Sequence, residues 1–300
     1  MSVAKLAAVD SVKTSAHSTD KELQKVLQQR GFRLGRTIGG GSYSKVRTAW
    51  FRRPRGRPLR CACKQLDCRQ APKDFVARFL PRELEVLRAV THPHIVQIFD
   101  VVGFGSQIFI FMELCEKGDL LEHIRARRGP LSEPKARLYF SQIVSAVDYL
   151  HSQDISHRDV KCENILLASN ECVKLTDFGF ARCCTDENNR RVLSRTFCGS
   201  AAYAAPEILQ GKPYNPKLYD AWSLGVVLFV MLTASMPFDD TNSKAMLYAQ
   251  LCRVINFPKH CEHSVSMNAR ELVRRLLEPD VTRRATVKHI KQNAWLKNEL

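Results

Sequence analysis

Two short motifs at a set interval constrain this chain more than any other feature. The first is His-Arg-Asp-Val-Lys-Cys-Glu-Asn at residues 157–164, and the second is Asp-Phe-Gly at residues 177–179. Asp159 has the chemistry to accept a proton from a hydroxyl group, while Asn164 and Asp177 supply the hard oxygen ligands that Mg²⁺ prefers. Chance can produce either motif, but not easily both in this order and spacing. Together they predict metal-assisted phosphoryl transfer, a reaction that depends on positioning and charge.

A glycine-rich segment precedes these motifs. Gly39, Gly40, Gly41 and Ser42 lie between two strand-like patterns, where glycines allow backbone N–H groups to approach phosphate oxygens closely. The pattern is G-x-G-x-x-S, with Ser44 in place of a frequent third glycine. By itself the segment fits an ordinary hairpin turn equally well.

A lysine within an apolar strand pattern also needs an explanation. Lys64 follows Cys61-Ala62-Cys63, and its ammonium group must reach an anion or another partner. Glu83 lies in the next helical pattern. The functional interpretation is a Lys64–Glu83 pair that orients ATP phosphates, and the alternative is a surface salt bridge.

The segment after the Asp-Phe-Gly motif has the features of a regulated loop. Thr196 lies between that motif and Ala205-Pro206-Glu207. A phosphate on Thr196 would add roughly two negative charges beside Arg158 and order the loop. The alternatives are an unmodified loop threonine and, as the nearest other site, phosphorylation of Ser194.

Periodicity predicts an α+β chain with a strand-rich first part and a helix-rich second part. Residues 1–31 are expected to form a flexible tail, with weak helical periodicity from residue 20. A helix is expected to start with Ser132 as its N-cap and to bury one apolar stripe, and the nearly uniformly apolar stretch 220–233 predicts a fully buried helix. Four strands are expected at 34–38, 46–50, 59–66 and 108–112, with a helix at 74–89 between the last two.

Residues 32–297 resemble a eukaryotic protein kinase domain, because all five chemical positions above are present in order. The resemblance implies a two-lobed fold, with a small antiparallel-sheet N-lobe carrying one main helix (about 32–111), a hinge (about 112–118) and a larger, mostly helical C-lobe (about 119–297). It implies ATP and Mg²⁺ as cofactors, with Lys161 balancing charge beside the transferred group. It also implies that Arg284 pairs with Glu207. The nucleotide-binding residues that the resemblance implies are Ile38, Gly39, Gly40, Gly41, Ser42, Val46, Ala62, Lys64, Glu83, Met112, Glu113, Cys115, Asp119, Glu163 and Leu166.

Lys161, two residues after Asp159, is typical of serine/threonine kinases. The amino-acid sequences of several loops, including 196–207 and 236–240, are most similar to those of the testis-specific serine/threonine kinases, which belong to the calcium/calmodulin-dependent group. That similarity implies a role in sperm development. Asp119 and Glu163 are expected to favour arginine upstream of the phosphoacceptor, although Asp119 could bind only the ribose.

The net charge of +16 raises the question of a polyanionic partner. Five arginines cluster between Arg52 and Arg60 among prolines and a glycine, which favours an exposed hairpin loop over a nuclear-targeting or nucleic-acid patch. Eleven cysteines without a secretory signal favour free thiols and a cytoplasmic, or also nuclear, location. No membrane or nucleic-acid partner is expected.

The predicted partners are protein substrates and an upstream activating kinase, and the chain is expected to be monomeric. Two rivals differ in class from an active kinase. A pseudokinase scaffold would fold in the same way without transferring phosphate. A basic nucleic-acid-binding protein would need a recognisable binding module, which the sequence lacks.

Overall fold

The computed structural model describes residues 16–41, 44–53, 55–71, 80, 86, 89–186, 188, 190–195 and 199–298. The described chain divides into two compact units, which are considered separately. The first extends to Thr91 and resumes over Val96–Leu114, and the second comprises His92–Ile95 and the chain from Cys115 onward.

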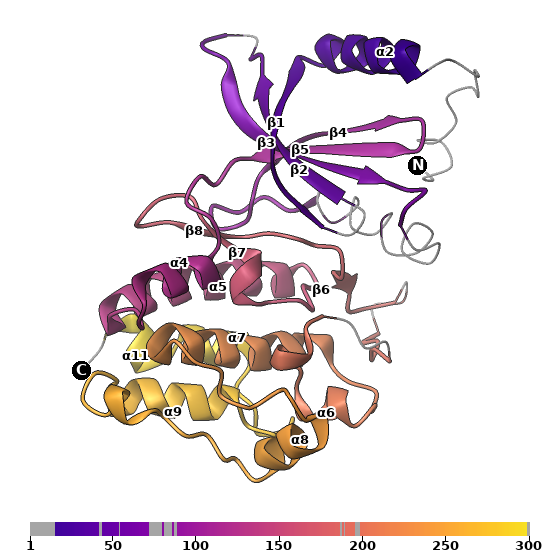
Figure 1. Ribbon diagram of the computed structural model, residues 1–300. Coiled ribbons are helices and arrows are strands. Elements are labelled where there is room, and N and C mark those ends of the chain that lie inside the picture. Colours follow the sequence, from indigo (N-terminus) through magenta and orange to yellow (C-terminus); the bar gives the residue numbers. More distant parts are fainter. Residues whose placement is uncertain are drawn as a thin grey trace. The chain divides into compact units, whose positions relative to one another are not determined.

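A five-stranded antiparallel sheet forms the first unit (Figure 1). Its spatial order is β1-β2-β3-β5-β4. Four of the strands coincide with predicted ones, and the fourth strand along the chain, β4, was not predicted. The bounds are β1 Phe32–Gly41, β2 Ser44–Phe51, β3 Leu59–Asp67, β4 Ile98–Phe104 and β5 Gln107–Glu113.

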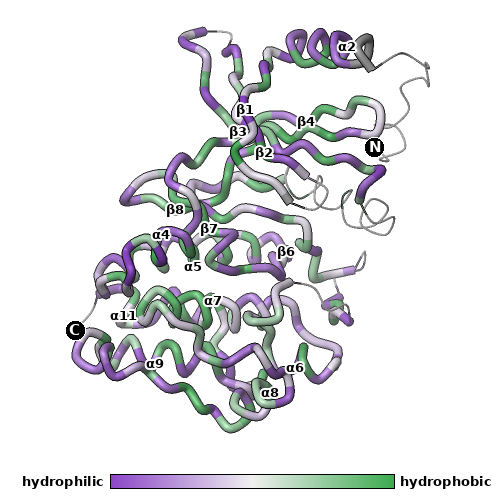
Figure 2. Tube along the Cα trace, viewed as in Figure 1, coloured by the Kyte–Doolittle hydropathy of each residue, from purple (hydrophilic) through white to green (hydrophobic). Residues whose placement is uncertain are grey.

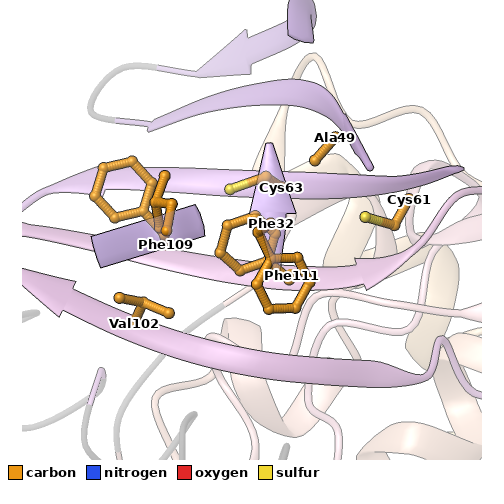
Figure 3. Close-up of a cluster of buried hydrophobic side chains, with 8 residues drawn as sticks. Phe32, Ala49, Cys61, Cys63, Val102, Phe109 and Phe111 are labelled. Atoms are coloured by element: carbon orange, nitrogen blue, oxygen red, sulfur yellow. The ribbon is translucent and has the colours of Figure 1, made fainter. Parts of the chain in front are cut away.

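One face of this sheet is covered by helix α2, Ala16–Gln29 (Figure 1). Leu27 is 2% exposed and packs in one cluster with sheet residues that include Phe32 and Phe111. The rings of Phe32 and Phe111 stack with their centroids 3.8 Å apart, as the close-up shows (Figure 3). Helix α2 agrees with the weak helical periodicity seen from residue 20 of the predicted tail, and it packs here because its apolar stripe finds an aromatic sheet face to cover. Residues 1–15 of that tail lie outside the described residues.

Helices dominate the second unit. The longest are α5, Glu133–Ser152, and α7, Pro216–Thr233. The predicted stripe of α5 is buried, and all but two of the 18 residues of α7 are buried, as predicted. Figure 2 shows hydrophobic residues concentrated along α7. The other helices are α4 Leu120–Arg127, α6 Pro206–Leu209, α8 Ser243–Leu251, α9 Met267–Leu276, α10 Val287–Lys291 and α11 Ala294–Lys297.

Short strand pairs and turns place the loops of this unit. Strand β6, Ile155–Ser156, pairs with β9, Arg182–Cys183, and β7, Ile165–Leu167, pairs with β8, Val173–Leu175. The described part of this unit also contains three 3₁₀ turns: η2 Cys162–Asn164, η3 Ala201–Tyr203 and η4 Lys259–Cys261.

A buried ion pair joins α6 to the loop before α10. Arg284 donates from Nη1 to Glu207 Oε1 at 2.6 Å and from Nη2 to Oε2 at 2.8 Å. Both side chains are almost fully buried, so removing either partner would leave an uncompensated charge. This pairing confirms the one implied by the family resemblance.

The α+β fold class is confirmed, with an antiparallel sheet followed by a mostly helical part. The helix predicted at 74–89 lies almost wholly outside the described residues, so it stays a prediction. Among the described helices, none is both long and apolar enough to cross a membrane.

Candidate active site

The loop between β6 and β7 holds the predicted catalytic residues of the second unit. Asp159 is 6% exposed, and its Oδ2 lies 2.9 Å from Lys161 Nζ. Asn164, at the end of η2, donates from Nδ2 to both the backbone oxygen of Asp159 (2.9 Å) and its Oδ2 (2.8 Å). The loop therefore brings together the Asp159 carboxylate, the Lys161 ammonium group and the Asn164 amide, which were all predicted to take part in phosphoryl transfer.

Asp220, on α7, holds the start of this loop in place through hydrogen bonds. Its carboxylate accepts hydrogen bonds from the backbone N–H groups of His157 (3.0 Å) and Arg158 (2.7 Å) and from the Ser156 hydroxyl (2.8 Å). Burial alone would raise the pKa of Asp220, but the hydrogen bond and charge of His151, with further help from His157 and the Arg158 N–H, lower it below its usual value. The buried carboxylate thus stays ionised and holds the loop.

The Asp-Phe-Gly motif packs on the same loop. The ring of Phe178 meets the ring of His157 edge-on, with centroids 5.0 Å apart. His157 Nε2 also lies 3.0 Å from the backbone oxygen of Thr176. These contacts place Asp177, which has a positive φ of 63° and an exposed side chain, next to a buried segment.

The two predicted metal ligands are linked through the backbone. The N–H of Thr176, adjacent to Asp177, donates to the backbone oxygen of Asn164 at 2.9 Å. Because both contacts of Asn164 to Asp159 use Nδ2, the other end of the amide, Oδ1, is the atom that could serve as an oxygen ligand. An amide oxygen and a carboxylate suit Mg²⁺, which usually takes only one or two protein carboxylates together with substrate phosphates. The residues present therefore fit the ion.

Two further carboxylates were predicted to face the substrate. Glu163 is exposed, and Tyr203 in η3 donates from its hydroxyl to Glu163 Oε2 at 3.3 Å. Burial, followed by the charges of Cys162 and Glu163, raises the pKa of Tyr203, so this hydroxyl keeps its proton. Asp119 caps α4, since its Oδ1 accepts from the backbone N–H of Glu122 at 2.8 Å.

The first unit carries the predicted nucleotide-binding residues in register with one another. Ala62 pairs with Met112 across β3 and β5, and Lys64 pairs with Val46 on its other side. Paired residues on neighbouring strands point to the same face, and residues two apart share that face. Val46, Ala62, Lys64 and Met112 therefore lie on one face of the sheet, opposite the face covered by α2. Gly39 and Gly40 lie in β1, whose Gly39 pairs with Val46, and Ile38 beside them is 45% exposed.

The remaining predicted positions occupy the connecting segments. Glu113 ends β5, and its Oε2 accepts a hydrogen bond from the N–H of Gln97 at 3.3 Å. The second unit resumes at Cys115, and Leu166, in β7, pairs with Asp119 in an isolated β-bridge. Ser42, Glu83 and Thr196 lie outside the described residues, so the Lys64–Glu83 pair and the phosphorylation of Thr196 stay predictions.

Three hydroxyl residues of the second unit contact the catalytic loop. From sequence, no role was assigned to Ser200 or Tyr203, and Ser194 was considered only as the alternative phosphorylation site nearest to Thr196. Ser200 accepts from Lys161 Nζ at 2.9 Å, Tyr203 holds Glu163, and Ser194 accepts from Arg158 Nη1 at 3.0 Å. All three carry hydroxyl groups and follow the Asp-Phe-Gly motif in the sequence. That placement was the only signal for them, because their partners lie 36 to 40 residues away.

Comparison with known proteins agrees with this arrangement. The protein kinase domain family matches residues 32–296. The chain is 46% identical to testis-specific serine/threonine-protein kinase 1 of Mus musculus over 273 residues, which cover 90% of this chain and 73% of the relative. It is 43% identical to testis-specific serine/threonine-protein kinase 3 of Homo sapiens over 275 residues, 91% of this chain and 99% of the relative. A plant protein, CBL-interacting protein kinase 9 of Oryza sativa subsp. japonica, is 35% identical over 89% of this chain and 57% of its own length.

Proposed function

The chain belongs to the protein kinase family, as a serine/threonine kinase related to the testis-specific group, and on this basis we propose a role for each residue of the site. Asp159 orients the substrate hydroxyl and accepts its proton as the γ-phosphate of ATP is transferred. The single observation that carries this proposal is the arrangement around Asp159, whose carboxylate is held by Lys161 and Asn164 on a loop anchored to Asp220.

The other residues bind the nucleotide and Mg²⁺ or balance charge beside the transferred phosphoryl group. Lys161 supplies positive charge beside Asp159, and its second contact to Ser200 keeps the ammonium group in place. Lys64 holds ATP phosphates, with Glu83 as its partner. Asn164 and Asp177 hold Mg²⁺, which neutralises phosphate charge when bound. The backbone of Gly39–Gly41, with Ser42, approaches the phosphates, and Ile38, Val46, Ala62, Met112, Glu113, Cys115 and Leu166 contact the adenine end of the nucleotide.

We propose two finer properties of the same site. Thr196 is phosphorylated by an upstream kinase in the active enzyme, because Arg158 immediately precedes Asp159 and can pair with a loop phosphate. Substrates carry an arginine upstream of the phosphoacceptor, most strongly three residues before it. Asp119 and Glu163 supply carboxylates that a guanidinium can bind with two hydrogen bonds.

We also propose a role in sperm development, which rests only on the names of the testis-specific relatives. Every cysteine in the described part of the chain is free, which suits a reducing compartment such as the cytoplasm, with or without entry into the nucleus. Binding to membranes or nucleic acid is not part of the proposal, and the kinase acts as a monomer.

Loss of phosphoryl transfer in two folded variants tests the assignment. We expect Lys64→Met and Asp177→Asn each to abolish incorporation of labelled phosphate from ATP into a generic basic protein, while thermal unfolding stays close to wild type. Lys25→Met on α2 and Asp240→Asn, both at exposed positions, serve as matched controls and should remain active.

Substantial activity in either folded active-site variant contradicts the residue assignment. An inactive wild-type protein contradicts the catalytic function itself and favours the pseudokinase scaffold. Salt-dependent DNA binding that is tighter than that of an unrelated basic protein would favour the nucleic-acid-binding alternative.

A further inference from the structure

A buried cation lies immediately before the catalytic aspartate. Arg158 is 2% exposed, its φ of 63° is in the left-handed region, and its backbone N–H is bound by Asp220. Among the described residues, no carboxylate pairs with its guanidinium. The guanidinium donates to two neutral oxygens, from Nε to the backbone oxygen of Phe180 at 2.7 Å and from Nη1 to the Ser194 hydroxyl at 3.0 Å.

Ser194 is fixed independently of this contact. Its N–H donates to the backbone oxygen of Tyr214 at 2.8 Å, and its own backbone oxygen accepts from Tyr214 at 2.9 Å. This isolated bridge ties the serine to the segment that leads into α7, and its side chain is fully buried. Two backbone hydrogen bonds to Tyr214 thus hold Ser194 in place, and its hydroxyl lies next to the Arg158 guanidinium.

The position of the Arg158 backbone affects the position of Asp159, the next residue in the chain. Gly199 approaches the backbone oxygen of Arg158 and Asp159 Oδ1 so closely that a Cβ there would lie 2.9 and 3.1 Å from them. A shift of the Arg158 peptide would therefore move Asp159 within a tightly packed space. Leaving a buried charged donor without an acceptor costs more than a normal hydrogen bond contributes, so the side chain would tend to leave its place if the acceptor were lost.

We propose that Ser194 is a positioning residue for the reaction, and this inference rests on the proposed kinase function. Its hydroxyl acts as the neutral partner of Arg158 when the loop carries no phosphate, which keeps Asp159 in place and supports a basal activity. A phosphate on Thr196 then supplies a stronger, anionic partner and makes the serine less important. The two residues are therefore partly redundant.

Four variants test the inference, made both in the wild-type chain and in a Thr196→Ala background that cannot be phosphorylated there. Ser194→Ala removes the acceptor, Ser194→Cys keeps the size with a much weaker acceptor, and Ser194→Thr keeps the hydroxyl. Ser223→Ala, at another buried serine, is the matched control. The measurements are kcat, KM for ATP and for a peptide, thermal unfolding, and the phosphorylation state by mass spectrometry.

In the Thr196→Ala background we expect Ser194→Ala and Ser194→Cys to lower kcat by about tenfold, with KM for ATP changed less than about twofold. Ser194→Thr should restore kcat, and Ser223→Ala should leave it unchanged. In enzyme phosphorylated on Thr196, the same Ser194→Cys change should lower kcat by less than about threefold.

Three results would overturn the inference. The first is an unchanged kcat for a folded Ser194→Cys variant in the Thr196→Ala background. The second is a loss of kcat in Ser194→Cys that is equal with and without the phosphate on Thr196. The third is a Thr196→Ala enzyme that has no basal activity while the phosphorylated wild type is active. A loss of kcat that only follows a loss of folded protein and is not rescued by Ser194→Thr also rejects it, because this assigns a structural role. An inactive wild-type enzyme instead rejects the kinase function, so the two failures are distinguishable.

Discussion

The carboxylate of Asp119 has a structural task in addition to the one proposed for it. Its Oδ1 caps α4 through the N–H of Glu122. An alanine at this position would remove the cap, at a cost of about 1 kcal/mol, together with the charge. Asparagine caps helices about as well as aspartate, so Asp119→Asn removes the charge alone. The choice of substitution at this residue therefore decides whether a substrate effect can be interpreted.

We predict that Asp119→Asn weakens a preference for arginine three residues before the phosphoacceptor by about tenfold, because the guanidinium loses a charge-assisted partner. A positional-scanning peptide library would measure the preference. Glu122→Gln, on the exposed first turn of the same helix, is the control and should leave it intact. An unchanged arginine preference in Asp119→Asn would reject this residue, and no arginine preference in the wild type would reject the specificity itself.

At the scale of elements, the second unit depends on close approach between helices. Gly225 lies in the middle of α7, and a Cβ there would stand 2.8 Å from Leu276 Cβ and 2.9 Å from Leu277 Cδ2. These contacts are shorter than real side chains tolerate, and they are made with Leu276, the last residue of α9, and Leu277, which follows it. A glycine is required here by packing, although it lowers the intrinsic helix propensity of α7 by about 1 kcal/mol relative to alanine.

We predict that Gly225→Ala destabilises the protein by about 1–2 kcal/mol, since the cost of overpacking exceeds the gain in helix propensity. Chemical denaturation would measure the free energy of unfolding. Gly129→Ala is the matched control, because a Cβ at that loop position meets nothing within 4 Å and its φ is not in the left-handed region. That variant should be neutral or stabilised by up to about 1 kcal/mol. Equal effects at the two glycines would contradict the packing argument.

At the scale of the whole molecule, the cysteines in the described part of the chain differ in exposure: five are buried, three are intermediate and two are exposed. Burial raises the pKa of Cys61 to about 11 and that of Cys162 to about 12. Burial, followed by neighbouring charges, also raises the pKa values of Cys63 and Cys184 to about 12. Cys183 and Cys252 are exposed. Because the thiolate is the reactive form, reactivity should follow this division.

We predict that iodoacetamide at about pH 8 alkylates Cys183 and Cys252 in the native protein while Cys61, Cys63, Cys162 and Cys184 react only after unfolding. Peptide mapping by mass spectrometry gives the extent at each site, and the same reaction in guanidinium chloride is the control in which all should react. Native-state labelling of Cys61 or Cys63 at the rate of Cys183 would show that the sheet core opens far more readily than its packing indicates.

The sequence by itself was sufficient to predict the residues proposed for the site, four strands of the first unit and the two longest described helices. The order and spacing of the His-Arg-Asp and Asp-Phe-Gly motifs were sufficient to name Asp159, Asn164 and Asp177. Strands β1, β2 and β3 and helix α5 were predictable from the spacing of their apolar residues, and β5 and α7 from nearly continuous apolar runs of strand and helix length. These signals are local, so a single chain carries them without any knowledge of its folded form.

Only the tertiary structure decided the contacts made over long sequence distances. Strand β4 contains Asp100 and Gly103 and has no clear alternation, but it forms because β5 offers a complete pairing edge. Helix α2 is ordered by the aromatic face of a sheet that follows it in sequence. The Ser194 hydroxyl meets Arg158 because Tyr214, 20 residues later, fixes its backbone. Hydrogen-bond partners and burial are set by residues brought together on folding, which local periodicity does not encode.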